Sequence, residues 1–181
     1  MTTTQHPTDL VRDDLLEALT KHRGLLRGTT DGLTDDQARL TPTASELSLG
    51  GLVKHVTVTE RQWAQFVVDG PADAPDVDWA SVDWSNPPAV VLAHLDGFTM
   101  RDDETLAGLL AAYDEVATAT DELVRTVDLG ARQPLPEAPW FEAGASWSAR
   151  RVFVHLVAET SQHAGHADII RETIDGRKSM G

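Results

Sequence analysis

The segment SARRVFVHLVAETSQHAGHADIIRETIDG, residues 148–176, combines a helical apolar pattern with three of the seven histidines of the chain. Ser148 is a favourable N-cap, and Gly176 is the residue type that commonly ends a helix. Leu156 and Ile170 fall on one side of a helix with 3.6 residues per turn, which predicts an amphipathic helix across the segment. A helix with one apolar side needs other elements to cover that side.

Glu159 and His163 lie on the apolar side of this predicted helix, four positions apart. Residues at this spacing are neighbours on a helix surface, so both side chains can reach one ligand. A carboxylate buried alone among apolar groups is costly, and a metal ion is a partner that carboxylate and imidazole groups bind well together. The spacing therefore indicates a metal-binding pair.

His55 is the predicted third ligand. It lies in SLGGLVKHVTVTERQWAQFVVDG, residues 48–70, beside an apolar face that includes Leu52. If this helix and the C-terminal helix are neighbours, His55 joins Glu159 and His163 in a site with two imidazoles, one carboxylate and an open position. Such a set is typical of catalytic zinc, and iron(II) or nickel(II) fits the same ligands.

Histidines on one side of a helix have a second interpretation, which the spacing leaves open: hydrogen-bonded side chains in a polar part of the core. We expect His155 and His166 either to support the site from outside the ligand set or to have a structural role. Glu60 lies near the same face as His55, where it either bonds to a ligand histidine or faces water. The histidines expected at the surface, or as filler without a role in a site, are His6, His22 and His94. The tryptophans expected to anchor the core or the loops are Trp63, Trp79, Trp84, Trp140 and Trp147.

The rest of the chain supplies three more long helical segments, separated by turn-forming residues. Thr34 and Gln37 begin a short helix as a capping box, and residues 131–147 form an irregular connection. No alternating strand pattern is evident. We therefore predict an all-α four-helix bundle in one domain, residues 1–181, with a long crossover, residues 71–101, folded over one end. The long helices are expected at residues 8–29, 48–70, 104–127 and 148–176.

Composition narrows the range of functions. The chain of 181 residues is 41% hydrophobic and has a formal net charge of −14 at pH 7. Phosphate contacts need a basic surface, so nucleic acids and anionic membrane surfaces are not expected partners. The chain has no cysteine, which excludes disulfides and a cysteine nucleophile and suits a cytoplasmic protein. The sequence contains neither a signal-peptide pattern nor an apolar run of membrane length.

Two motifs, GGLVKHVTVTERQW at residues 50–63 and HLVAETSQHAGHADIIRETIDG at residues 155–176, together resemble the DinB-like superfamily. The similarity extends over about residues 10–176 and is greatest to an actinobacterial branch near the mycothiol-dependent enzymes. This resemblance implies a bundle, often dimeric, with one metal-binding histidine on the second long helix and two ligands on the fourth. These roles fall on His55, Glu159 and His163, a His–Glu–His set similar to that of mycothiol-dependent maleylpyruvate isomerase.

The isomerase has an additional C-terminal domain, whereas this chain ends a few residues after its last predicted helix. The resemblance therefore implies a small S-transferase and a homodimer. Its divalent metal, zinc before nickel or iron, would lower the pKa of a thiol such as mycothiol, and the thiolate would attack a small electrophile. Two alternatives remain: a metal-dependent hydrolase with water as the nucleophile, and a non-catalytic metal-binding protein related to stress.

Overall fold

The computed structural model describes residues 7–72, 82–83, 85–136, 138 and 141–179. Over these ranges the secondary structure consists of α-helices and one pair of very short strands, so the protein is all-α as predicted. The elements in chain order are α1 (Pro7–Gly28), α2 (Asp35–Arg39), α3 (Leu49–Asp69), α4 (Ala89–Asp96), α5 (Leu106–Thr126), β1 (Arg132–Pro134), β2 (Ser146–Ser148) and α6 (Ala149–Asp175).

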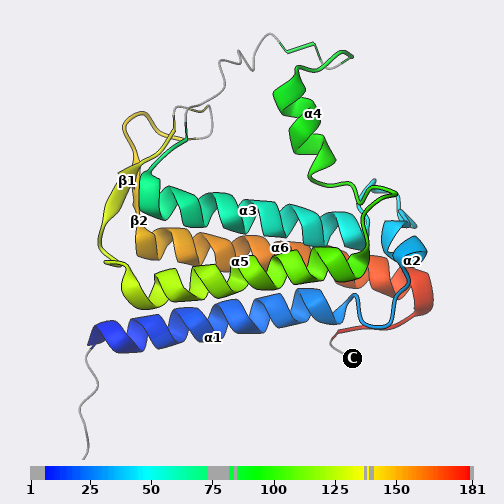
Figure 1. Ribbon diagram of the computed structural model, residues 1–181, viewed down its shortest axis with the longest axis horizontal. Coiled ribbons are helices and arrows are strands. Elements are labelled where there is room, and N and C mark those ends of the chain that lie inside the picture. The colour runs from blue at the N-terminus through cyan, green and yellow to red at the C-terminus, as the bar shows by residue number, and fades with distance from the viewer. Residues whose placement is uncertain (1–6, 73–81, 84, 137, 139–140, 180–181) are drawn as a thin grey trace, which may run out of the picture.

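The four long helices, α1, α3, α5 and α6, form a bundle (Figure 1). Helix α6 packs against both α1 and α3, and α5 contacts both α3 and α1. The predicted four-helix bundle is thus confirmed. Its arrangement also makes α3 and α6 neighbours, and these two helices carry the three predicted metal ligands.

Helix ends follow the capping residues in the sequence. The Ser48 and Ser148 side chains each accept a hydrogen bond from a backbone N–H in the first turn of α3 and α6. Thr34 and Gln37 form the predicted capping box at the start of α2. Gly176 ends α6 with φ of 78°, a left-handed conformation that favours glycine.

The interior of the bundle contains two large apolar clusters, one around Phe153 and one around Ile170. Buried polar side chains lie between these clusters along the helices. Arg23 on α1 donates two hydrogen bonds to the Glu60 carboxylate on α3, and its Nη1 donates to Oδ1 of Asp121 on α5 at 2.7 Å. This buried ion-pair layer joins three helices of the bundle.

A short antiparallel hairpin interrupts the connection that the sequence predicts to be irregular. Strands β1 and β2 pair with Gln133 opposite Trp147. Each strand has three residues, too few to produce an alternating pattern, which explains why the sequence gives no sign of them. The hairpin leads directly into α6 and brings Trp147 next to the first turns of that helix.

The crossover differs in part from the prediction. Helix α4 extends away from the bundle instead of folding over one end of it (Figure 1). The residues that follow α4 do pack on the bundle, because Lys54 Nζ on α3 donates to the Thr99 carbonyl and to the Glu104 carboxylate, each at 3.0 Å. Lys54 Nζ also lies 3.6 Å from Oδ2 of Asp96, so these contacts fix the crossover at the end of α4 and after it, and they leave the rest of the helix projecting.

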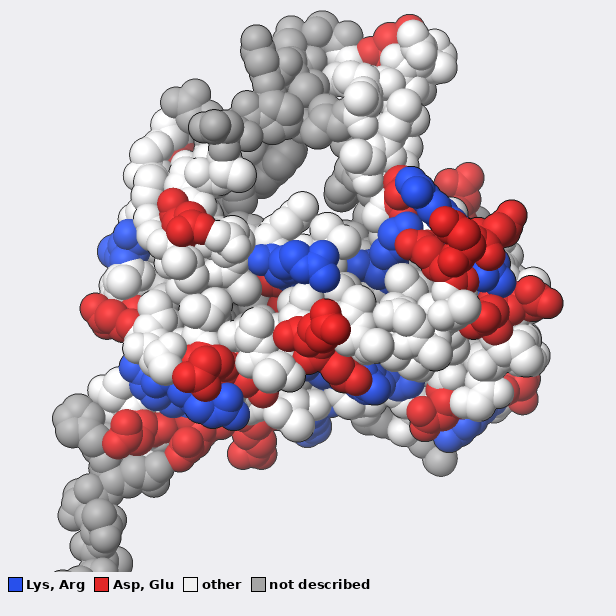
Figure 2. All heavy atoms as spheres, viewed as in Figure 1, with Lys and Arg blue, Asp and Glu red and all other residues white. Residues whose placement is uncertain are grey.

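The surface reflects the negative net charge of the chain. Figure 2 shows acidic side chains spread over the visible face among basic ones, as expected for a formal charge of −14. Among the described residues, none of the helices is both long enough and apolar enough to cross a bilayer.

Candidate metal centre

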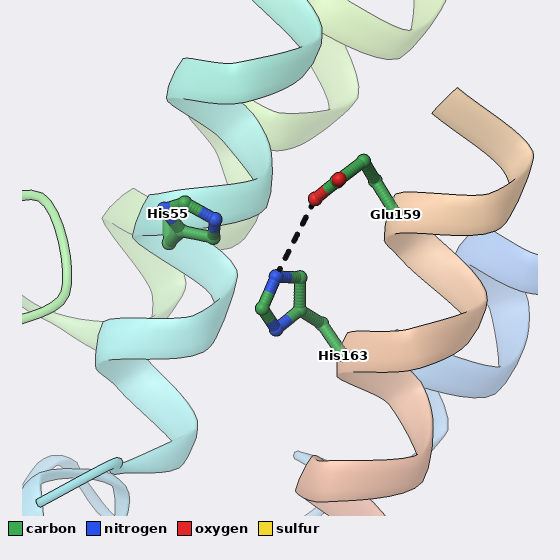
Figure 3. Close-up of side chains that lie close together, drawn as sticks. All are labelled: His55, Glu159 and His163. Carbon is green, nitrogen blue, oxygen red and sulfur yellow. Dashed lines mark ion pairs between the residues drawn. The ribbon is translucent and has the colours of Figure 1, made fainter. Parts of the chain in front are cut away.

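His55, Glu159 and His163 lie together between α3 and α6 (Figure 3). Each offers one ring nitrogen or carboxylate oxygen, and these three atoms all lie within 4.8 Å of one another. His163 Nε2 is 3.6 Å from Glu159 Oε2, and the His55 and His163 rings meet edge to face with their centroids 4.7 Å apart. The structure thus brings the three predicted residues to one place.

Local helix geometry produces half of this arrangement. Glu159 and His163 are one turn apart on α6, so their side chains leave the helix on the same side. That side also carries Leu156 and Ala167, which are buried in the core. The His163 side chain is 11% exposed and that of Glu159 is 29% exposed, so the pair lies at the rim of the apolar interior.

The residues fit a divalent cation. His163 Nε2 and Glu159 Oε2 are 3.6 Å apart, which is beyond hydrogen-bond distance. The two side chains are therefore close together without forming a hydrogen bond to each other. Burial lowers the pKa of His163 from its ordinary value, although the nearby Glu159 carboxylate opposes this, and the neutral imidazole is the form that binds metals. A cation between these groups would also compensate the partly buried Glu159 charge.

The two other histidines of α6 lie beside the three candidate ligands. His155 Nε2 is 3.7 Å from Glu159 Oε1, so Glu159 lies between two imidazoles. The His166 ring centroid is 5.7 Å from that of His163. Neither residue belongs to the group whose donor atoms converge. Supporting roles for them stay a prediction.

Aromatic side chains border the site on two sides. On one side, Trp63 stacks on Trp147 with centroids 5.1 Å apart, the Arg151 guanidinium lies 4.1 Å from the Trp147 ring centre, and His155 meets both indoles edge on. On the other side, Phe98 stacks on His55 with centroids 3.7 Å apart. Phe98 precedes α5 in an irregular stretch, and the sequence pattern did not single it out.

Several other sequence predictions have definite outcomes. Glu60 does neither of the two things expected of it, because it is 1% exposed and paired with Arg23. His22 is not a simple surface residue, since its Nδ1 lies 2.9 Å from the Ser161 hydroxyl. Trp63 and Trp147 pack against the apolar core, as predicted. The predictions for His6, Trp79, Trp84, Trp140 and the His94 side chain lie outside the described residues.

The mycothiol-S-transferase family model matches residues 14–176, which include all three converging side chains and most of the bundle. The chain belongs to the mycothiol-S-transferase family. Membership in this family confirms the resemblance to DinB-like, mycothiol-related proteins that the two sequence motifs carry.

Comparisons with individual proteins add the fold alone. No curated protein sequence matches the chain. A solved structure, that of a conserved protein from Enterococcus faecalis, matches with a TM-score of 0.63 over 96% of this chain and 100% of the other. The two sequences are 14% identical, so the likeness shows the fold alone and carries no information on chemistry.

Proposed function

We propose that the protein is a divalent-metal-dependent S-transferase that joins mycothiol, or a similar low-molecular-weight thiol, to a small electrophile. In this proposal His55, Glu159 and His163 bind the metal, with zinc expected first. The observation that carries it is the convergence of two imidazoles and one carboxylate within 4.8 Å, inside the region that matches the mycothiol-S-transferase family. A bound divalent ion would supply positive charge that favours the thiolate over the thiol near neutral pH.

The side chains around the site have separate tasks in this proposal. His55 and His163 each offer a ring nitrogen to the cation, and Glu159 supplies one negative charge that offsets part of the charge of the cation. The paired rings of Trp63 and Trp147 form an apolar border that limits water and offers surface to an organic substrate. The attacking sulfur comes from the small thiol, because the chain has no cysteine.

The reaction belongs in a reducing compartment, and we place it in the cytoplasm, where small thiols stay reduced. We also propose that residues 1–181 form one domain. The two alternatives can be tested in the same assay. A transferase consumes the thiol together with the electrophile, a hydrolase consumes its substrate without a thiol, and a non-catalytic metal-binding protein consumes neither.

The activity should require both metal and thiol. With mycothiol and a fluorogenic alkyl halide, the thiol sulfur forms a bond to carbon, the halide leaves and the thiol proton passes to solvent. We expect fluorescence to rise faster than the uncatalysed reaction, to fall to that background after chelation, and to return with added Zn²⁺. Glu159→Gln should reduce the rate at least about 10-fold. Glu172→Gln on the same helix, half exposed and paired with Lys178, is the matched control and should retain the rate.

Two results would contradict the transferase. Ester cleavage that proceeds without any thiol would favour the hydrolase. Retention of metal without turnover of alkyl halides or esters would favour the non-catalytic protein.

We also propose a homodimer, on the strength of the resemblance to dimeric DinB-like bundles. Two chains of formal charge −14 repel each other, so a dimer must be held by a specific interface. Sedimentation at micromolar concentration should therefore give twice the chain mass, and raising the salt concentration should not dissociate the pair, because salt screens the repulsion. A monomer under both salt conditions would contradict this.

A further inference from the structure

We propose that Phe98 is a positioning residue of the metal centre, which holds the His55 imidazole toward Glu159 and His163, and that Gly51 in α3 leaves room for the Phe98 backbone. The inference rests on the proposed metal site. It adds a part of the chain, the segment just after α4, that the family resemblance does not assign to that site.

Two aromatic rings pack against the His55 imidazole. Phe98 lies almost parallel to the His55 imidazole, with centroids 3.7 Å apart and an interplanar angle of 17°. His163 meets the His55 ring edge on, at 76°. An imidazole packed in this way by two rings has lost much of its freedom to rotate about its side-chain bonds.

Two glycines in the first turn of α3 allow the segment that contains Phe98 to approach closely. A Cβ on Gly51 would clash with the Phe98 carbonyl oxygen, and a Cβ on Gly50 would clash with the Met100 sulfur. The backbone at Phe98 thus rests directly on the first turn of α3. Glycine is less favourable than alanine inside a helix, so these two residues weaken α3 where the segment approaches it.

Charged contacts fix the segment on both sides of Phe98. Lys54, the residue before His55, donates to the Thr99 carbonyl at 3.0 Å and pairs with the Glu104 carboxylate. The Arg101 guanidinium donates to both oxygens of Asp96, at 2.8 and 2.7 Å. The backbone on both sides of Phe98 is therefore held in place by these charged side chains.

This support matters because the three candidate ligands are fixed unequally. Glu159 and His163 leave one helix one turn apart, which sets their relative position. His55 comes from a different helix, so the direction of its ring decides whether the three donors converge before a metal arrives. Groups that orient a metal-binding histidine commonly contribute about 10–100-fold to metal affinity.

The test uses the full chain, with Co²⁺ as the metal probe and two substitutions at one position. Phe98→Leu keeps an apolar side chain but removes the flat ring, and Phe98→Tyr keeps the ring. In the metal-free protein, NMR should show the His55 ring protons losing their ring-current shift in Phe98→Leu and keeping it in Phe98→Tyr. Co²⁺ affinity should fall about 10-fold or more in Phe98→Leu and stay within about twofold of wild type in Phe98→Tyr.

Gly51→Ala tests the close approach of the Phe98 backbone to α3, and it changes neither the Phe98 ring nor the His55 ring. The new methyl group meets backbone, which cannot move aside as a flexible side chain would, so we expect the same loss of Co²⁺ affinity as in Phe98→Leu. Gly24→Ala on α1 is the matched control, because nothing lies within 4 Å of its added Cβ. This control should bind Co²⁺ as wild type does.

The outcomes separate the two levels of the proposal. A wild-type protein that binds no Co²⁺ overturns the metal centre and the positioning role built on it. A wild-type protein that binds Co²⁺, with Phe98→Leu binding equally well, overturns the role of Phe98 alone. Equal losses in Phe98→Leu and Phe98→Tyr would also overturn it, because a general packing defect would then be the cause.

Discussion

Replacing His163 with alanine should remove most binding of divalent metal. His163 contributes one of the three donors and faces Glu159 at 3.6 Å, and its side chain is 11% exposed. Its loss leaves His55 and Glu159 on different helices, without the pair that Glu159 and His163 form on α6. We expect Zn²⁺ or Co²⁺ affinity to fall by more than about 100-fold, beyond the usual effect of removing a group that only orients a ligand. Metal analysis of protein purified without added metal, followed by Co²⁺ titration, measures the change.

Two companion variants give the result its meaning. Glu159→Gln keeps the shape of the side chain but removes its full charge, so metal should bind more weakly without disappearing. His166→Ala removes the neighbouring ring, and activity should fall more than metal content. If His163→Ala retains the metal of the wild type, the alternative of hydrogen-bonded histidines in a polar core is the better description.

The α6 half of the site could be predicted because helix geometry alone sets it. The spacing of Glu159 and His163 fixes which side of α6 they share, and the neighbouring apolar residues fix which side faces the bundle. His55 needed one more fact, the adjacency of α3 and α6, since periodicity within a helix does not say which helices pack together. The structure supplies that adjacency.

The parts that escaped prediction depend on contacts between residues far apart in the chain. Phe98 lies in an irregular stretch without periodicity, so no sequence pattern places it beside His55. Glu60 was placed correctly near the apolar face, but its partner Arg23 is 37 residues away on α1. The spacing of residues within one helix does not predict which residue of another helix they contact.

The Arg23 contacts lead to the second large effect, on stability. Arg23 is 5% exposed, and it neutralises Glu60, which is 1% exposed. Removing one partner of a buried ion pair leaves an uncompensated charge and typically costs about 3–5 kcal/mol. Because domains of this kind have only about 5–15 kcal/mol of unfolding free energy, Arg23→Ala should lose a large part of it. Urea unfolding followed by circular dichroism measures the change, and a loss below about 1 kcal/mol would contradict it.

Arg27 provides a matched control, one turn further along α1. It also pairs with an aspartate on α5, Asp114, but the two side chains are 36% and 61% exposed. Exposed pairs of this kind contribute about 0–1 kcal/mol, so Arg27→Ala should change stability far less than Arg23→Ala. Replacing Arg23 and Glu60 together with leucine should recover part of the loss, because it removes both buried charges, while Asp121 keeps access to water with 23% of its side chain exposed. Similar losses for Arg23→Ala and Arg27→Ala would instead assign the effect to lost packing of the arginine stem on α1, independent of buried charge.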